Sequence, residues 1–425
     1  MTVTVFLGSL LGAMALGMPI AFALLVCGIA LMFAQDAVNM TILSQKLVEG
    51  ADSFPLLAIP FFILAGELMN AGGMSRRIVN FALACVGHIR GGLGLVAVFA
   101  AVVMAAISGS AAADAAALGT LLIPMMRQAG YNIPRSAGLI AAGSIIAPVM
   151  PPSVALIVFG VVANVSIGKL FMAGIVPGML MGLSLVIAWL LVVRRDNVGV
   201  QPRPPLREVL ASARSAVWSL LMPFGIVGGM RFGVFTPTEA AVAACAYALL
   251  VGLFIYRELK LGAIYGLLVS AAKTTSVVVF LIAAALVSAW LITTSSVPQQ
   301  IGAMLQPFMD SPRLLMFLMM LLVIVVGTAL DFAPTLLILT PVLMPIVKEA
   351  GIDPVYFGTL FVMNNAIGLI TPPVGIVLNV LSGVARVSMG EVVRGVWPFL
   401  LAQTIVLFLL VIFPQIVLVP LKWLY

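Results

Sequence analysis

Long runs of apolar residues alternate with short polar or proline-containing segments along the whole chain. A membrane-spanning helix needs about 20 apolar residues, so this length allows about 10 to 13 such segments, some of them re-entrant. The first run covers residues 3–34 and fits either one tilted span or two short helices joined near Gly17-Met18-Pro19. The pattern predicts an all-α, polytopic membrane protein with one membrane domain.

Composition supports a membrane location and indicates an orientation. Of the 425 residues, 63% are hydrophobic and 8% are charged, whereas soluble domains have roughly 25% charged residues. The one long hydrophilic connection, residues 194–214, carries five arginines, one aspartate and one glutamate. The positive-inside rule places this linker in the cytoplasm, between a first half at 1–193 and a second half at 215–425. The net charge of +7 therefore reports loop orientation and gives no support for nucleic-acid binding.

Two pairs of adjacent prolines interrupt apolar segments at matching places. Pro151-Pro152 lies within 133–165 and Pro372-Pro373 lies within 354–385, so the pairs are 221 residues apart (372 − 151 = 221). Proline lacks a backbone N–H donor and pushes the preceding residue out of the helical region, so each segment must open into two half-helices. Hydrocarbon cannot satisfy the carbonyls freed by such a break, so each break must be buried in protein or face water.

A hairpin precedes each break. Apolar pieces flank a short tip at 108–114 in the first half and at 327–334 in the second, which predicts hairpins at about 91–130 and about 313–350. The pieces are short for full crossings, which favours re-entrant hairpins. Repeats with a hairpin and an interrupted helix are typical of secondary transporters. We infer from this transporter logic that the two repeats are inverted, and hairpins that open on the same side would refute the inversion.

The breaks and hairpin tips supply oxygen atoms suited to a small hard cation. Carbonyls released from helical bonding can coordinate such an ion, and nearby hydroxyls can join them. Prolines that merely kink packed helices are the alternative, and two matched breaks behind polar tips favour the cation sites over it. The candidate cation-binding residues are Ser108, Gly109, Ser110, Gly143, Pro148, Gly327, Thr328, Gly368 and Thr371.

The same breaks create candidate sites for an anionic substrate. Half-helices begin near Ser153 and Gly375, where free amides and the helix dipole attract carboxylates. Asn364 and Asn365 add neutral donors, although asparagines also join neighbouring helices in membranes. Asp331, at the second tip beside the second break, completes the candidate substrate-binding residues.

Three further acids lie in apolar surroundings, where a charge is costly and a function is expected by default. Asp114 fits two roles, a ligand contact or a cap for the helix expected at 115–126. Glu239 follows Thr236 by three residues, which is the spacing of a capping box. Glu67 would suit an arginine partner, but the sequence identifies none.

Signatures of enzymes and metal centres are missing from the sequence. It contains no HExxH, GxSxG or Walker motif, and its three cysteines show no CxxC spacing. We therefore expect no catalytic residues, no transition metal and no organic cofactor. Because the chain has no ATP motif, transport would have to draw on an ion gradient.

Five motifs resemble those of the large permease subunit of tripartite ATP-independent periplasmic (TRAP) transporters. The motifs are SFPLLAIPFFILAGELMNAGG at 53–73, ISGSAAAD at 107–114, Pro-Pro-Ser at 151–153, GVFTPTEAA at 233–241 and GLITPPVG at 368–375. The resemblance covers essentially the whole chain, and within the family the chain looks most like the subgroup associated with sugar acids such as 2,3-diketogulonate.

This resemblance implies a sodium-driven, elevator-type ion-transporter fold, in which a scaffold stays still while the hairpins and broken helices carry the substrate. It implies Na+ as the coupling ion at the tips and breaks, with the substrate between the tips. It also implies a small four-helix membrane subunit on a separate chain, and a periplasmic binding protein that delivers an organic acid at a bacterial inner membrane. The alternatives are a stand-alone sodium–dicarboxylate symporter or, in a different class, a channel or a membrane-embedded enzyme.

Overall fold

The computed structural model describes residues 2–36, 38–194, 199, 202–294, 308–309 and 311–425. Every regular element in these ranges is a helix, and seven of the helices described are long and apolar enough to cross a membrane. Shorter apolar helices accompany these seven. The structure therefore confirms the prediction of an all-α, polytopic membrane protein.

The N-terminal apolar run forms two helices and not one tilted span. Helices α1 and α2 pack against each other, and the chain turns between them at Gly17, whose φ is +78°. Pro19 then precedes α2 directly. The N-terminal helices are α1 (Thr2–Ala15), α2 (Ile20–Ala34), α3 (Met40–Ala51), the short 3-10 helix η1 (Phe54–Leu57), α4 (Ala58–Ala71) and α5 (Met74–Val86).

The first hairpin and the first broken helix follow. The hairpin turns at Gly109, whose φ of +63° is a conformation that glycine adopts without strain. The next helix stops at Ser144 and resumes at Val154, so the interruption surrounds Pro151-Pro152, whose peptide bond is cis. The helices are α6 (Gly92–Ser108), α7 (Ala111–Gln128), α8 (Ile133–Ser144), α9 (Val154–Ala163) and α10 (Ile167–Val193).

The connection between the two halves is shorter than the linker expected at 194–214. Helix α11 begins at Leu206, because good helix formers follow Pro205 and Glu208 lies in the first turn. Residues 195–198 and 200–201 of the expected linker lie outside the described ranges. Thr236 and Glu239 form the predicted capping box at the start of α12. The helices here are α11 (Leu206–Arg231), α12 (Pro237–Leu250), the π-helix η2 (Val251–Ile255) and α13 (Leu261–Thr294).

The second half contains a set of helices that matches the first hairpin and break. Helix α7 begins at Ala111 and α16 at Phe332, which is 221 residues later (332 − 111 = 221). The peptide bond of Pro372-Pro373 is also cis and lies between α17 and α18. The helices are α15 (Pro312–Ala329), α16 (Phe332–Glu349), α17 (Pro354–Gly368), α18 (Ile376–Ala385), α19 (Met389–Ile412) and α20 (Gln415–Leu424).

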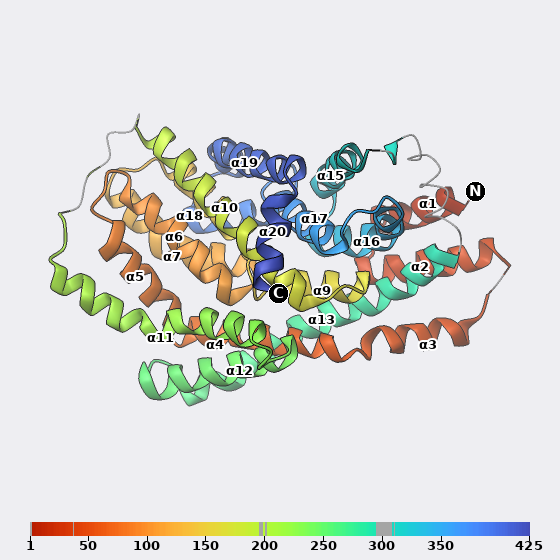
Figure 1. Cartoon of the computed structure of the whole chain (residues 1–425), viewed down its shortest axis with the longest axis horizontal. Coiled ribbons are helices and arrows are strands. Elements are labelled where there is room, and N and C mark those ends of the chain that lie inside the picture. Colours follow the sequence, from red (N-terminus) through yellow and green to blue (C-terminus); the bar gives the residue numbers. More distant parts are fainter. Residues whose placement is uncertain (1, 37, 195–198, 200–201, 295–307, 310) are drawn as a thin grey trace.

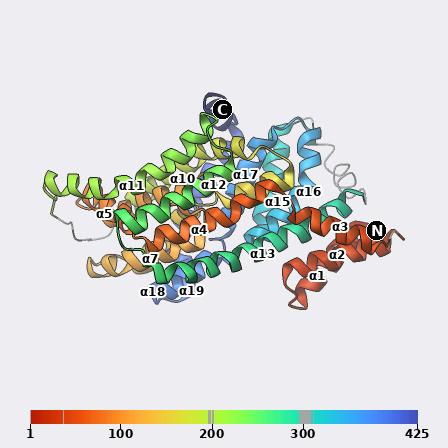
Figure 2. The same ribbon diagram turned by 90° about the horizontal axis from the view of Figure 1, so that it is seen from below.

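Helices of the two halves pack in equivalent pairs. Helix α7 packs on α18 and its counterpart α16 packs on α9, while α2 packs on α13 and α12 packs on α4. In both views the first hairpin (α6 and α7) and the second (α15 and α16) lie toward opposite ends of the long axis of the molecule (Figures 1 and 2). The halves are therefore interleaved, and the two hairpin tips meet near the middle.

Candidate functional site

A cavity of 460 Å³ lies where the hairpin tips, the helix breaks, α4 and α13 meet. This volume lies within the range of roughly 300–1,000 Å³ that is usual for small-molecule sites. The lining residues are 108–113 and 331–333 at the tips, Pro148 and Leu369 at the breaks, Val154, Ala155, Val158, Ile376 and Val377 on the half-helices, Leu336 on α16, Ile63, Gly66, Glu67 and Asn70 on α4, and Thr274 and Val278 on α13.

Four helices, α7, α9, α16 and α18, begin at this cavity. Backbone N–H groups in the first turn of a helix have no partner within the helix and carry partial positive charge. Six such amides have no acceptor in the described part of the chain, and every one of them belongs to a lining residue. They are the amides of Ala111, Ala112, Val154, Ala155, Ala333 and Ile376. The cavity therefore offers a cluster of N–H donors that suits an anion.

The charged side chains at the cavity are acidic. Glu67 and Asp331 line it, and the described lining contains no lysine, arginine or histidine. The Oδ1 atom of Asp331 accepts a hydrogen bond of 2.7 Å from the amide of Phe332, so Asp331 caps α16 as well as facing the cavity. An anion at this site would therefore be held by backbone amides and not by basic side chains.

The first hairpin tip rests against the first break. A Cβ added at Gly109 would lie 3.2 Å from the carbonyl oxygen of Pro152, so the tip and the break touch through the backbone. The amide of Ser110 donates to Ser108 Oγ at 3.3 Å, and Ser110 accepts from the amide of Ala113. Two of the predicted hydroxyls therefore lie at this contact.

Asp114 has a different place from the cap that the sequence allowed. The cap of α7 is Ser110, because the helix begins at Ala111, four residues earlier than expected. The Asp114 side chain is fully buried, the Ser108 side chain lies close enough to act on it, and neither carboxylate oxygen has a hydrogen-bond partner of normal geometry within the described residues. A buried, unpartnered carboxylate is costly, which indicates that it serves a ligand.

The second tip and break meet in a similar way. A Cβ added at Gly368 would lie 3.1 Å from the carbonyl oxygen of Gly327, and Asn365 Oδ1 lies 4.0 Å from a Cβ added at Gly327. The hydroxyls of Thr328 and Thr371 donate to carbonyls one turn earlier in their own segments, at 2.7 and 2.8 Å. Their oxygen lone pairs remain available to a cation.

The prolines free carbonyls at both breaks, as their chemistry predicts. No backbone amide in the described part of the chain donates to the carbonyls of Pro151, Pro152, Pro372 or Pro373. Gly143 differs from the prediction, because its carbonyl accepts from the amide of Ile146 at 3.1 Å and is not free. The candidate carbonyl ligands are therefore found at the prolines themselves.

Several predicted residues support the break without lining the cavity. Ser153 caps α9 and donates its hydroxyl to the carbonyl of Pro148 at 2.5 Å. Gly375 precedes α18 with a φ of +42°. Asn364 and Asn365 are buried, and their amide groups donate at 2.6 Å to the carbonyls of Met320 and Phe332 respectively. These two asparagines thus join helices, the role that the sequence left as the alternative, while their Oδ1 atoms are buried without a partner in the described chain.

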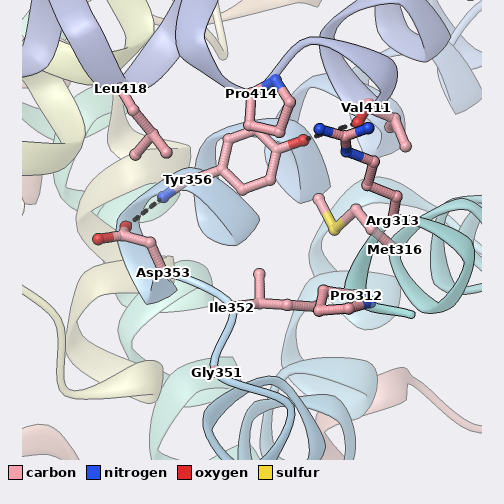
Figure 3. A pocket seen from close by; sticks show the side chains of 10 residues that line it. All are labelled: Pro312, Arg313, Met316, Gly351, Ile352, Asp353, Tyr356, Val411, Pro414 and Leu418. Atoms are coloured by element: carbon pink, nitrogen blue, oxygen red, sulfur yellow. Dashed lines mark hydrogen bonds between the residues drawn. The ribbon is translucent and has the colours of Figure 1, made fainter. Parts of the chain in front are cut away.

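A second, smaller cavity of 170 Å³ lies at the base of the second hairpin (Figure 3). The hydroxyl of Tyr356 donates to the carbonyl of Leu410 at 2.9 Å, and Asp353 Oδ1 accepts from the amides of Val355 and Tyr356. The chain itself therefore satisfies these polar groups. None of the predicted site residues lines this cavity.

The helices and the donor-lined cavity between two hairpins define a polytopic membrane transporter for a small anion. Residues 7–416 match the family described as "Tripartite ATP-independent periplasmic transporter, DctM component". The chain belongs to this family, the large permeases of TRAP transporters.

Curated relatives span the whole length of the chain. The "2,3-diketo-L-gulonate TRAP transporter large permease protein YiaN" of Escherichia coli is 55% identical over 100% of both chains. The "Sialic acid TRAP transporter large permease protein SiaM" of Vibrio cholerae is 40% identical over 95% of both chains. The "C4-dicarboxylate TRAP transporter large permease protein DctM" of Pseudomonas aeruginosa is 40% identical over 93% of this chain and 92% of its own length. These relatives are transporter subunits and not enzymes, and the resemblance found in the sequence motifs is confirmed.

A solved structure shares the fold. The crystal structure of the Alcanivorax borkumensis YdaH transporter aligns with a TM-score of 0.62 over 88% of each chain, at 15% sequence identity. At that identity the likeness concerns the fold alone.

Proposed function

We propose that this chain is the large membrane subunit of a sodium-driven secondary transporter that imports a small organic acid across a bacterial inner membrane. A periplasmic binding protein would deliver the acid, and a small four-helix membrane subunit would complete the complex. The words "tripartite" and "periplasmic" in the family description support both partners. The name of the relative that is 55% identical supports a sugar acid as the substrate.

The observation that carries the proposal is the convergence of helix starts on one cavity. First-turn amides of four helices face the space between the hairpin tips, and the described lining contains no basic side chain. An organic carboxylate fits such a set of donors, because the amides and helix dipoles supply positive potential without a permanent charge. A site of this kind holds an anion and can still release it.

Two groups of buried oxygens support Na+ as the coupling ion. At the first tip these are the carboxylate of Asp114, the hydroxyl of Ser108 and the freed carbonyl of Pro152. At the second tip they are Asn365 Oδ1 and the backbone near Gly327. Hard oxygen ligands, including carbonyls of interrupted helices, are what transporters use for Na+.

The pairing of the halves supports inverted repeats and an elevator mechanism. Gln403 donates to the carbonyl of Met181 at 3.3 Å, and these positions are equivalent at the offset of 222 that applies after the breaks (403 − 181 = 222). Contact between equivalent residues is expected on a two-fold axis, and the two hairpins lie toward opposite ends of the molecule (Figures 1 and 2). In this mechanism the hairpins and broken helices would move against α4 and α13.

Reconstitution in liposomes tests the proposal. Uptake of a sugar acid is expected only when the large subunit, the small subunit, the binding protein and an inward sodium gradient are all present. Uptake by the large subunit alone would refute dependence on partners and indicate a stand-alone symporter. Flux that neither saturates nor needs sodium would indicate a channel.

A further inference from the structure

The cavity between the hairpin tips has two chemically different walls. One wall consists of helix starts and offers N–H donors. Asp331 lies on this wall, where the start of α16 compensates its charge through the bond to the Phe332 amide. The opposite wall consists of α4 and α13, and its charged group is Glu67. A bound molecule therefore meets donors at one end and an anionic acceptor at the other.

Glu67 presents an unused acceptor to the cavity. Its Oε1 atom accepts a hydrogen bond of 2.7 Å from the hydroxyl of Ser270 on α13, which fixes the carboxylate. Its Oε2 atom is buried and has no hydrogen-bond partner in the described part of the chain. The neighbouring Asn70 already uses its side-chain oxygen to accept from Ser75. A buried acceptor without a donor is rare because it costs free energy, and a ligand donor would remove that cost.

The position of Glu67 relative to the first tip makes it a fixed part of the wall. A Cβ added at the preceding Gly66 would lie 3.5 Å from Ser108 Cα, so α4 passes directly beside the tip of the hairpin. An ionised carboxylate at this place accepts hydrogen bonds and cannot donate them. It attracts hydroxyl groups and repels a second carboxylate.

We propose that Glu67, held by Ser270, accepts hydrogen bonds from hydroxyl groups at the end of the substrate opposite its carboxylate, and so selects hydroxylated monocarboxylates over dicarboxylates. This inference rests on the proposed function, because it takes the cavity as the substrate site. The substrate carboxylate lies at the helix starts, and the hydroxylated end lies against α4.

Equilibrium binding to the full-length purified chain tests this role, with D-gluconate and D-glucarate as probes. The two acids differ only at the far end, where glucarate carries a second carboxylate in place of a hydroxyl. The wild-type chain should bind gluconate about tenfold or more tightly than glucarate, since hydrogen bonds to charged groups change binding by about this factor. Glu67→Gln should reduce this ratio by about tenfold, and Ser270→Ala should give an intermediate ratio.

Controls separate selectivity from folding and from coupling. Glu49→Gln makes the same chemical change at an acid that pairs with Lys46 outside the cavity, and it should leave the ratio unchanged. An unchanged ratio in Glu67→Gln would overturn the proposal, as would a wild-type chain that binds glucarate as tightly as gluconate or binds neither. Because binding requires no gradient or partner, failure here alongside sodium-dependent uptake in liposomes would refute only the role of Glu67.

Discussion

Replacing Asp114 with asparagine should abolish the stabilisation of the protein by sodium. The wild-type carboxylate is fully buried and unpartnered within the described chain, and it lies close to Ser108 at the contact between the first tip and the first break. Asparagine keeps the shape of the side chain and removes its charge. The substitution therefore tests the charge alone.

The expected size of the effect follows from the burial of the group. Removing one partner of a buried charge pair costs about 3–5 kcal/mol, which corresponds to a loss of sodium affinity of about a hundredfold or more. A ligand at a hundred times its dissociation constant stabilises the folded state by about 2.7 kcal/mol. The variant should lose most of this gain. Without sodium the sign reverses, because the wild-type chain then buries an uncompensated charge and the variant does not.

Thermal unfolding of the purified chain across a sodium series, with choline as the replacement cation, measures both effects. The wild-type midpoint should rise with sodium, whereas the variant should start at an equal or higher midpoint and stay nearly flat. Asp353→Asn is the matched control, because Asp353 caps α17 by accepting from two amides and asparagine is an equally good cap. A sodium response in Asp114→Asn equal to that of the wild type would refute the assignment.

Two further predictions concern the tips and breaks. Ser108→Ala and Thr371→Ala should each raise the sodium concentration that gives half-maximal uptake, and an unchanged value in both would exclude their hydroxyls as ligands. Gly368→Ala should destabilise the protein by about 1–3 kcal/mol, because the new Cβ would lie 3.1 Å from the carbonyl oxygen of Gly327. Gly383→Ala, where a Cβ meets nothing within 4 Å, should not destabilise it in the same thermal unfolding assay. Equal midpoints for the two alanine variants would show that the tip and the break do not touch as described.

Local chemistry allowed the sequence to predict much of the architecture. The two Pro-Pro pairs had to interrupt their helices because proline has no N–H to donate, and the structure places the breaks there. The capping box of Thr236 and Glu239 was readable because its partners are three residues apart. The offset of 221 residues likewise predicted the second hairpin from the first.

Contacts between distant residues decided the rest. The partner of Glu67 is Ser270, which is 203 residues away along the chain, so no local pattern could name it. Asp114 resembled a cap because it opens an apolar run, but packing starts the helix earlier and leaves its carboxylate buried. Asn364 and Asn365 resembled substrate ligands, yet their amide groups bond to backbone carbonyls of neighbouring segments.

The sequence by itself determined where the helices break, because proline, glycine and capping residues act on the backbone within a few positions. Only the tertiary structure decided that four helix starts face one cavity and that Glu67 closes it from the other side. The direction in which a helix start points, and the burial of an acid, depend on the packing of segments far apart in the chain. The chemistry of the substrate cavity therefore lies in the arrangement of the two halves.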